Sequence, residues 1–202
     1  LARGAQSPTK LRVEVNGEVR HQSIITDRRR IAVAAPGGAS VRVVADPGVL
    51  LGAPTLYRPE ARPSHIVVVV VDTLRADHLG AWGYPRPTSP ELDGLAMGGT
   101  RFSRCLSPTP WTLPSTRAIV SGVHPWDWTD ETATLLTRLA DVGWATASIS
   151  RNPWLDERNG VPRGASMIDA RAREDAAEDV ASAAAWLAGE ADRSAVLLLH
   201  LM

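Results

Sequence analysis

Two short segments of this chain carry residues that could do chemistry together, around Asp72 and Thr112. Asp72 directly follows an apolar, β-branched run at residues 65–71, and such a run is typical of a strand buried on both faces of a parallel sheet. Ligands bind beyond the carboxyl ends of such strands. Asp72 is therefore placed to hold a hard cation or a substrate group. Capping of the following turn is the alternative role of this residue.

The second segment reads WTLPSTRAIVSG and covers residues 111–122. Pro114 suits the first turn of a helix, which puts Thr112 at the N-terminal end, where free N–H groups and the helix dipole favour an anion. A nearby cation could then activate the Thr112 hydroxyl as a nucleophile. In the alternative interpretation, Thr112 or Ser115 is only the N-cap of the helix.

Three further polar residues are candidates for contacts with an anionic substrate. Asn152 follows an expected strand at residues 145–150 and so faces the same edge of the sheet, although Asn before Pro is also a common turn former. Arg75 and Arg117 carry planar guanidinium groups that bind oxyanions in a bidentate manner. Each of these arginines could instead pair with a neighbouring carboxylate.

The elements that must position these residues alternate between strand and helix in the second part of the chain. This alternation predicts an α/β fold with a mainly parallel sheet flanked by helices. The expected strands cover residues 65–71, 145–150 and 195–201, and the expected helices cover about 90–98, 129–142 and 172–188. His200, near the end of the last strand, is expected to face the core or a neighbouring residue.

The first part of the chain has a different pattern, which predicts a small antiparallel β domain over residues 1–60. Apolar and polar residues alternate with the period of a half-buried strand, and Asn16-Gly17 is a strong hairpin signal. Three prolines mark a linker to the α/β domain, which we place at residues 61–202. The expected strands cover residues 11–15, 19–25, 31–35 and 41–44, and the prolines are Pro54, Pro59 and Pro63.

The composition excludes several classes of function. Lys and Arg number 22, as do Asp and Glu, so no global field attracts nucleic acid or an anionic membrane. One cysteine, Cys105, excludes an internal disulfide framework. The longest apolar run, at residues 66–71, is too short to span a bilayer, which takes about 20 residues. We therefore expect no nucleic-acid partner and no membrane span.

The segment VDTLRADHLG at residues 71–80, followed by WGY at 82–84, closely resembles the first metal-binding segment of the sulfatase family in the alkaline phosphatase superfamily. In that family a carboxylate at the end of the first strand ligates the catalytic divalent cation, and Asp72 matches this position. Thr73 stands where many members have a second Asp.

The segment at residues 111–122 resembles the sulfatase signature. Aligned on Pro114 and on the final Ser-Gly, the nucleophile position of the signature falls on Thr112, and its Arg position falls on Thr116, with Arg117 one residue later. Classical sulfatases convert a Cys or Ser to formylglycine, which a Thr cannot yield, so no formylglycine is expected at Thr112. The same superfamily includes phosphotransferases and phosphodiesterases that use an unmodified Thr.

The resemblance covers residues 64–202 and implies an incomplete alkaline phosphatase-like domain. It implies a metal-dependent hydrolase or transferase that acts on sulfate or phosphate esters of small molecules or glycans, in an extracytoplasmic location, although no signal peptide is visible. Asp72 and Thr112 would bind one or more divalent cations, either calcium or zinc or manganese. Thr112 and Arg117 would be catalytic, and Asn152 and Arg75 would contact the substrate.

A non-catalytic module that binds a glycan or a sulfated ligand is the alternative. The two hypotheses differ in one feature, because an enzyme of this kind needs further Asp and His ligands, which we expect beyond Met202. We accordingly expect residues 1–202 to be inactive alone. A sheet with an exposed edge also predicts poor solubility.

Overall fold

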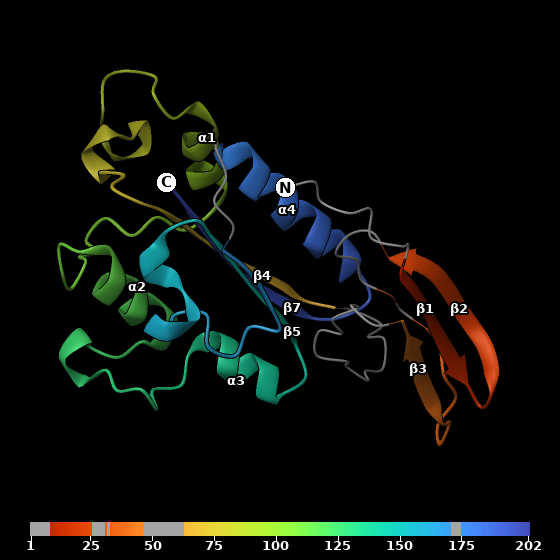
Figure 1. Cartoon of the computed structure of the whole chain (residues 1–202). Coiled ribbons are helices and arrows are strands. Elements are labelled where there is room, and N and C mark those ends of the chain that lie inside the picture. The colour runs from red at the N-terminus through yellow and green to blue at the C-terminus, as the bar shows by residue number, and fades with distance from the viewer. Residues whose placement is uncertain (1–8, 26–30, 32, 47–62, 171–174) are drawn as a thin grey trace, which may run out of the picture. The chain divides into compact units, whose positions relative to one another are not determined.

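A computed structural model describes residues 9–25, 31, 33–46, 63–170 and 175–202. The chain divides into two compact units, Leu1–Thr55 and Leu56–Met202, which Figure 1 draws in red to brown and in yellow to blue. Within the described ranges, no helix is long and apolar enough to cross a membrane. Of the three linker prolines, Pro54 and Pro59 lie outside the described residues.

The first unit contains a three-stranded antiparallel sheet in the order β2-β1-β3. Its strands are β1 (Thr9–Val15), β2 (Glu18–Ile25) and β3 (Val41–Ala45). The predicted hairpin turn is present, since Asn16 and Gly17 have φ angles of 52° and 83°, as a two-residue turn of the I′ type requires. Alternate residues of β1 point to a buried face: Leu11, Val13 and Val15.

The strand predicted at residues 31–35 is wrong, because its described residues, 31 and 33–35, belong to no strand. Strand pairing is a long-range event, and here β3 occupies the second edge of β1, with Leu11 opposite Ala45 and Val15 opposite Val41. An apolar alternation cannot by itself show which of two candidate segments pairs with that edge.

The second unit contains a four-stranded parallel sheet in the order β4-β7-β5-β6. Its strands are β4 (His65–Val71), β5 (Ala145–Ser150), β6 (Met167–Asp169) and β7 (Ala195–Leu201). The first, second and fourth of these have the predicted bounds. The expectation that the strand at 65–71 is buried on both faces is wrong, because no residue of β4 is buried and β4 is an edge strand of the described sheet. The sequence did not indicate β6, since a strand of this length is too short for a periodic pattern.

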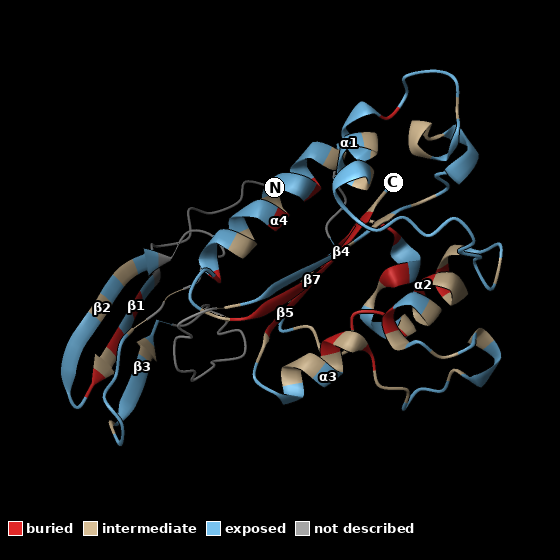
Figure 2. Cartoon of the chain, turned by 180° about the vertical axis from the view of Figure 1, so that it is seen from behind, coloured by how far each residue is buried: buried red, intermediate tan, exposed pale blue. Residues whose placement is uncertain are grey.

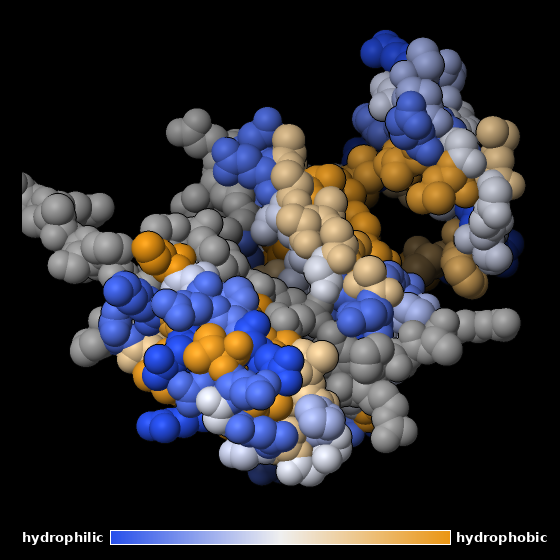
Figure 3. Space-filling model, turned by 90° about the vertical axis from the view of Figure 1, so that its right-hand side faces the viewer, coloured by the Kyte–Doolittle hydropathy of each residue, from blue (hydrophilic) through white to orange (hydrophobic). Residues whose placement is uncertain are grey.

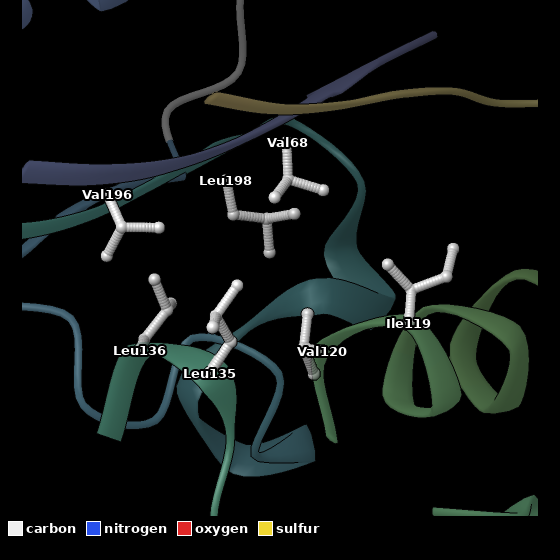
Figure 4. A pocket seen from close by; sticks show the side chains of 7 residues that line it. All are labelled: Val68, Ile119, Val120, Leu135, Leu136, Val196 and Leu198. Atoms are coloured by element: carbon white, nitrogen blue, oxygen red, sulfur yellow. The ribbon is translucent and has the colours of Figure 1, made fainter. Parts of the chain in front are cut away.

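Helices cover both faces of this sheet, as Figures 1 and 2 show. On one face, α2 (Thr112–Ser121) and α3 (Leu135–Asp141) pack on β7, and α4 (Ala176–Gly189) packs on the other face. The two strands β5 and β7 are buried almost throughout, which explains why their sequences lack an alternating polar face. Seven apolar side chains meet between the sheet and α2 and α3 (Figure 4): Val68, Ile119, Val120, Leu135, Leu136, Val196 and Leu198.

The remaining helices are short, and their bounds depend on local caps. The helix expected at 129–142 is confined to α3, because Thr134 is its N-cap and accepts a hydrogen bond from Thr137 N at 3.1 Å. The helix expected at 172–188 begins after Asp175, and residues 172–174 lie outside the described ranges. The other helices are α1 (Pro90–Gly98), η1 (Ala76–His78), η2 (Gly80–Trp82), η3 (Pro125–Asp127), η4 (Pro153–Leu155) and η5 (Glu157–Asn159).

Candidate active site

Asp72 lies at the carboxyl edge of the parallel sheet, one residue beyond β4. The ladder between β4 and β7 continues through its backbone, because Asp72 N donates to Leu201 O at 2.9 Å. The backbone is therefore fixed by the sheet while the side chain, which is 19% exposed, projects beyond it. This is the position that the sequence predicted for a cation-binding or substrate-binding carboxylate.

Thr112 is the first residue of α2, and its hydroxyl lies against the Asp72 carboxylate. Its Oγ1 is 3.3 Å from Asp72 Oδ1 and 3.1 Å from Asp72 Oδ2, to which the hydroxyl donates. The N-cap is Trp111, with no side-chain hydrogen bond, so Thr112 does not act as the helix cap. Ser115 also has a different role, since its hydroxyl bonds to Thr109.

Asn152 reaches the same carboxylate from the loop after β5. Its Nδ2 donates to Asp72 Oδ2 at 3.3 Å, while its Oδ1 accepts from Trp154 N at 3.0 Å. The side chain is buried. One end of the Asn152 amide thus shapes the turn, as one interpretation predicted, and the other end contacts Asp72. Its contact with a substrate stays a prediction.

His200 is a site residue that the sequence did not indicate. It lies in β7 between Val70 of β4 and Ser150 of β5, and its Nε2 is 3.6 Å from Asp72 Oδ2. The side chain is fully buried, and neither ring nitrogen has a hydrogen-bond partner. Burial lowers the pKa of His200, and the nearby Asp72 carboxylate raises it to a smaller extent.

The structure does not bring the two predicted arginines to this cluster. Arg75 forms an exposed bidentate pair with Asp77, with N–O distances of 2.9 Å and 2.5 Å. Arg117 donates twice to Asn159 O, at 3.0 Å and 2.8 Å, and lies 4.9 Å from the ring centre of Trp128. In the part of the chain that the structure describes, no hydrogen bond or ion pair joins either arginine to Asp72 or Thr112.

Thr116, at the Arg position of the signature, is also turned inward. It is 1% exposed, and its Oγ1 donates to Thr112 O at 2.8 Å. Such a bond between a Thr side chain and the carbonyl one helical turn earlier is a common way to satisfy a buried hydroxyl. Thr116 therefore supports the first turn of α2 and presents no charge to the site.

Two tryptophans flank the cluster. Trp111 directly precedes Thr112, and Trp154 follows Asn152 by one short turn. Their rings meet edge to face, with centroids 5.8 Å apart and an interplanar angle of 74°. Each residue is 52% exposed, so the pair offers apolar ring surface to solvent from positions close in the chain to Thr112 and Asn152.

The donor set fits part of a coordination shell for a divalent cation. A carboxylate and a hydroxyl, the types of oxygen ligand that hard cations prefer, approach each other at the N-terminal end of α2. Among the described residues, no group of three or more His, Cys, Asp or Glu side chains could hold a metal ion. Asp72 and Thr112 would thus supply two ligands, and a complete shell needs others.

Comparison with known proteins relates residues 64–166 to a family described as Sulfatase. Human arylsulfatase A (Homo sapiens) is 42% identical over 65 residues, which are 32% of this chain and 13% of that protein. Mouse steryl-sulfatase (Mus musculus) is 32% identical over 95 residues, 47% of this chain and 14% of that protein. The chain thus matches only a small part of each of these relatives.

Solved structures show the same fold. The C-terminal periplasmic domain of EptC from Escherichia coli superposes with a TM-score of 0.57 at 18% identity, over 72% of this chain and 45% of that one. The lipooligosaccharide phosphoethanolamine transferase EptA from Neisseria meningitidis gives a TM-score of 0.54 at 20% identity, over 72% of this chain and 29% of that one. The expected alkaline phosphatase-like architecture is confirmed.

Proposed function

Because this chain belongs to the sulfatase family, we propose that it is part of a metal-dependent hydrolase or transferase that acts on sulfate or phosphate esters, with Thr112 as the nucleophile. The observation that carries this proposal is the contact of the Thr112 hydroxyl with both oxygens of Asp72, at 3.3 Å and 3.1 Å. An alcohol is a weak nucleophile, and a base or a cation beside it is what makes it reactive.

Thr112 would attack the sulfur or phosphorus atom in line with the ester oxygen. A bond from Thr112 Oγ1 to that atom would form as the bond to the leaving alcohol oxygen breaks, and water or a second alcohol would then take the group from Thr112. Asp72 accepts the hydroxyl hydrogen, which turns the Oγ1 lone pairs away from the carboxylate. The free N–H groups in the first turn of α2 would favour binding of the negatively charged, non-bridging oxygens of the sulfate or phosphate group.

Asp72 and Thr112 would hold the divalent cation. When bound, the cation lowers the pKa of the hydroxyl and neutralises negative charge that develops in the transition state. Calcium suits an all-oxygen shell, whereas zinc or manganese suits one with nitrogen ligands. Asn152 holds the Asp72 carboxylate in its present orientation.

Replacement of the nucleophile tests this proposal in the full-length protein. With the 4-nitrophenyl esters of sulfate and phosphate as substrates, Thr112→Ala should lower kcat by at least roughly a thousandfold, while Thr112→Ser should keep measurable turnover. The relative rates for the two esters would also identify the preferred group. Turnover by Thr112→Ala within tenfold of the wild type would exclude Thr112 as the nucleophile.

An extracytoplasmic location is part of the proposal. It is supported by the fold shared with a domain that is described as periplasmic. A substrate outside the cytoplasm would be a small ester or a sulfated or phosphorylated glycan. Fractionation of cells that express the full-length protein would test this location.

A non-catalytic module that binds a glycan or a sulfated ligand is the second candidate. The exposed pair of Trp111 and Trp154 favours it, because a binding site uses aromatic surface of this kind to hold the apolar part of a ligand. Such a module would bind the ester without turnover at any cation concentration, whereas the enzyme would consume it.

A further inference from the structure

The two oxygens of Asp72 have different surroundings. Oδ2 faces three groups: Thr112 Oγ1 at 3.1 Å, Asn152 Nδ2 at 3.3 Å and His200 Nε2 at 3.6 Å. Among the described contacts, Oδ1 has only Thr112, at 3.3 Å. One oxygen thus faces potential donors from three segments of the chain, and the other faces Thr112 alone among the described contacts.

The ring of His200 forms no hydrogen bond with any other described residue. Both ring nitrogens are buried and without a hydrogen-bond partner, which is a costly state for a polar group. The backbone cannot move to relieve it, because β7 pairs on both sides, with Val70 and with Ser150 opposite His200. Among the described residues, the ion-pair contact of the ring is with the Asp72 carboxylate.

We propose that His200 is a positioning residue that holds Asp72 Oδ2, so that Oδ1 is the oxygen presented to the cation. The separation of 3.6 Å is slightly too long for a hydrogen bond, and a small rotation of the carboxylate closes it with Nε2–H as the donor. Hydrogen bonds of this kind orient the carboxylates that bind metals, and their loss costs about 10–100-fold in affinity. This inference rests on the proposed function, since it assumes that Asp72 is a ligand.

The test measures cation binding by calorimetry in the full-length protein, with Zn²⁺, Mn²⁺ and Ca²⁺ titrated separately. His200→Phe keeps a flat ring but removes the donor, so it should raise the Kd by about 10–100-fold. His200→Gln offers an amide N–H at a similar reach and should recover most of that loss. Thr146→Val is the matched control, since Thr146 is equally buried and lies on β5, away from the site; it should leave the Kd unchanged.

A His200→Phe protein with a Kd within twofold of the wild type would overturn the inference and leave the proposed function standing. Absence of binding by the wild type to all three ions would overturn both. Nitrogen-15 NMR of labelled histidine in the wild type does not depend on a variant that folds. It should show a proton on Nε2 of His200 in the cation-bound protein, and an unprotonated Nε2 would contradict the inference.

Discussion

At the scale of single residues, Thr73 stands out because its backbone is strained. It directly follows Asp72 and has a φ of 57°, in the left-handed region that β-branched residues rarely occupy. A residue in this region costs about 1–3 kcal/mol and persists only where its surroundings enforce it. Such strain gathers at functional sites, and here it redirects the chain immediately after the carboxylate that the site is built around.

Thr73→Gly should therefore raise the free energy of unfolding. Glycine adopts a positive φ without a steric penalty, although it also gains entropy in the unfolded chain, so we expect a net gain of about 1 kcal/mol. Urea unfolding of both proteins measures it. Thr109→Gly, in a loop with no positive φ, is the control and should not stabilise. A loss of stability in Thr73→Gly would show that contacts of the Thr73 side chain outweigh the strain.

The sequence could predict the residues whose positions follow from neighbouring elements. Asp72 and Asn152 each come soon after a strand, and Thr112 begins a helix, so their convergence at one edge of the sheet follows from parallel topology. His200 could not be found in this way. Its place beside Asp72 depends on the register that sets it opposite Val70, and the side chains of Arg75 and Arg117 are engaged by local partners that no spacing reveals.

At the scale of elements, α2 matters because its first residue is the proposed nucleophile. The helix ends at Ser121, and its C-cap is Gly122, which has a φ of 70° and donates from its backbone N to Ala118 O at 2.8 Å. A left-handed residue at this place closes the last turn and satisfies a free carbonyl. The length and direction of α2, and hence the position of Thr112, depend in part on this end.

Gly122→Ala should cost about 1 kcal/mol, because alanine is strained at this φ. Gly94→Ala is the matched comparison. Gly94 lies inside α1 with a negative φ, and an added Cβ there would meet nothing within 4 Å, so this change should stabilise by about 0.5–1 kcal/mol. Urea unfolding of the two variants should give shifts of opposite sign; shifts of equal sign would contradict the argument.

The sequence predicted the elements with strong local signals and failed where pairing or capping decided. The strands at 65–71, 145–150 and 195–201 have the expected bounds, and the last two are buried as expected, whereas β4 is not. The segment at 31–35 is also apolar, yet β3 holds the place beside β1. The helix predicted at residues 129–142 was also placed too early, because the cap at Thr134 starts α3 at Leu135.

At the scale of the whole molecule, β4 is incompletely covered. Val67 and Val69 are 44% and 52% exposed, although their register partners in β7, Leu197 and Leu199, are buried. In the described sheet β4 is an edge strand, and a hydrophobic edge is a template for association with another chain. Hydrophobic side chains are also visible among hydrophilic ones on the face drawn in Figure 3.

Residues 1–202 should therefore self-associate through β4, and the double variant Val67→Thr with Val69→Thr should reduce this. Threonine keeps the β-branched shape that suits a strand but makes the exposed surface polar. Analytical ultracentrifugation over a range of concentrations measures the association. Val196→Thr, at a fully buried position of β7, should instead lower stability without reducing association; equal effects of both changes would exclude β4 as the contact.

The strand order has a consequence for the way this protein is made. β7 lies between β4 and β5, yet the ribosome synthesises both of those strands before it. Until β7 inserts, the three chain segments that carry Asp72, Thr112 and Asn152 have no common sheet edge to hold them together. Such long-range closure is slow and leaves apolar strands open to misassembly in the meantime. The three segments that carry these residues thus converge only after β7 has been made.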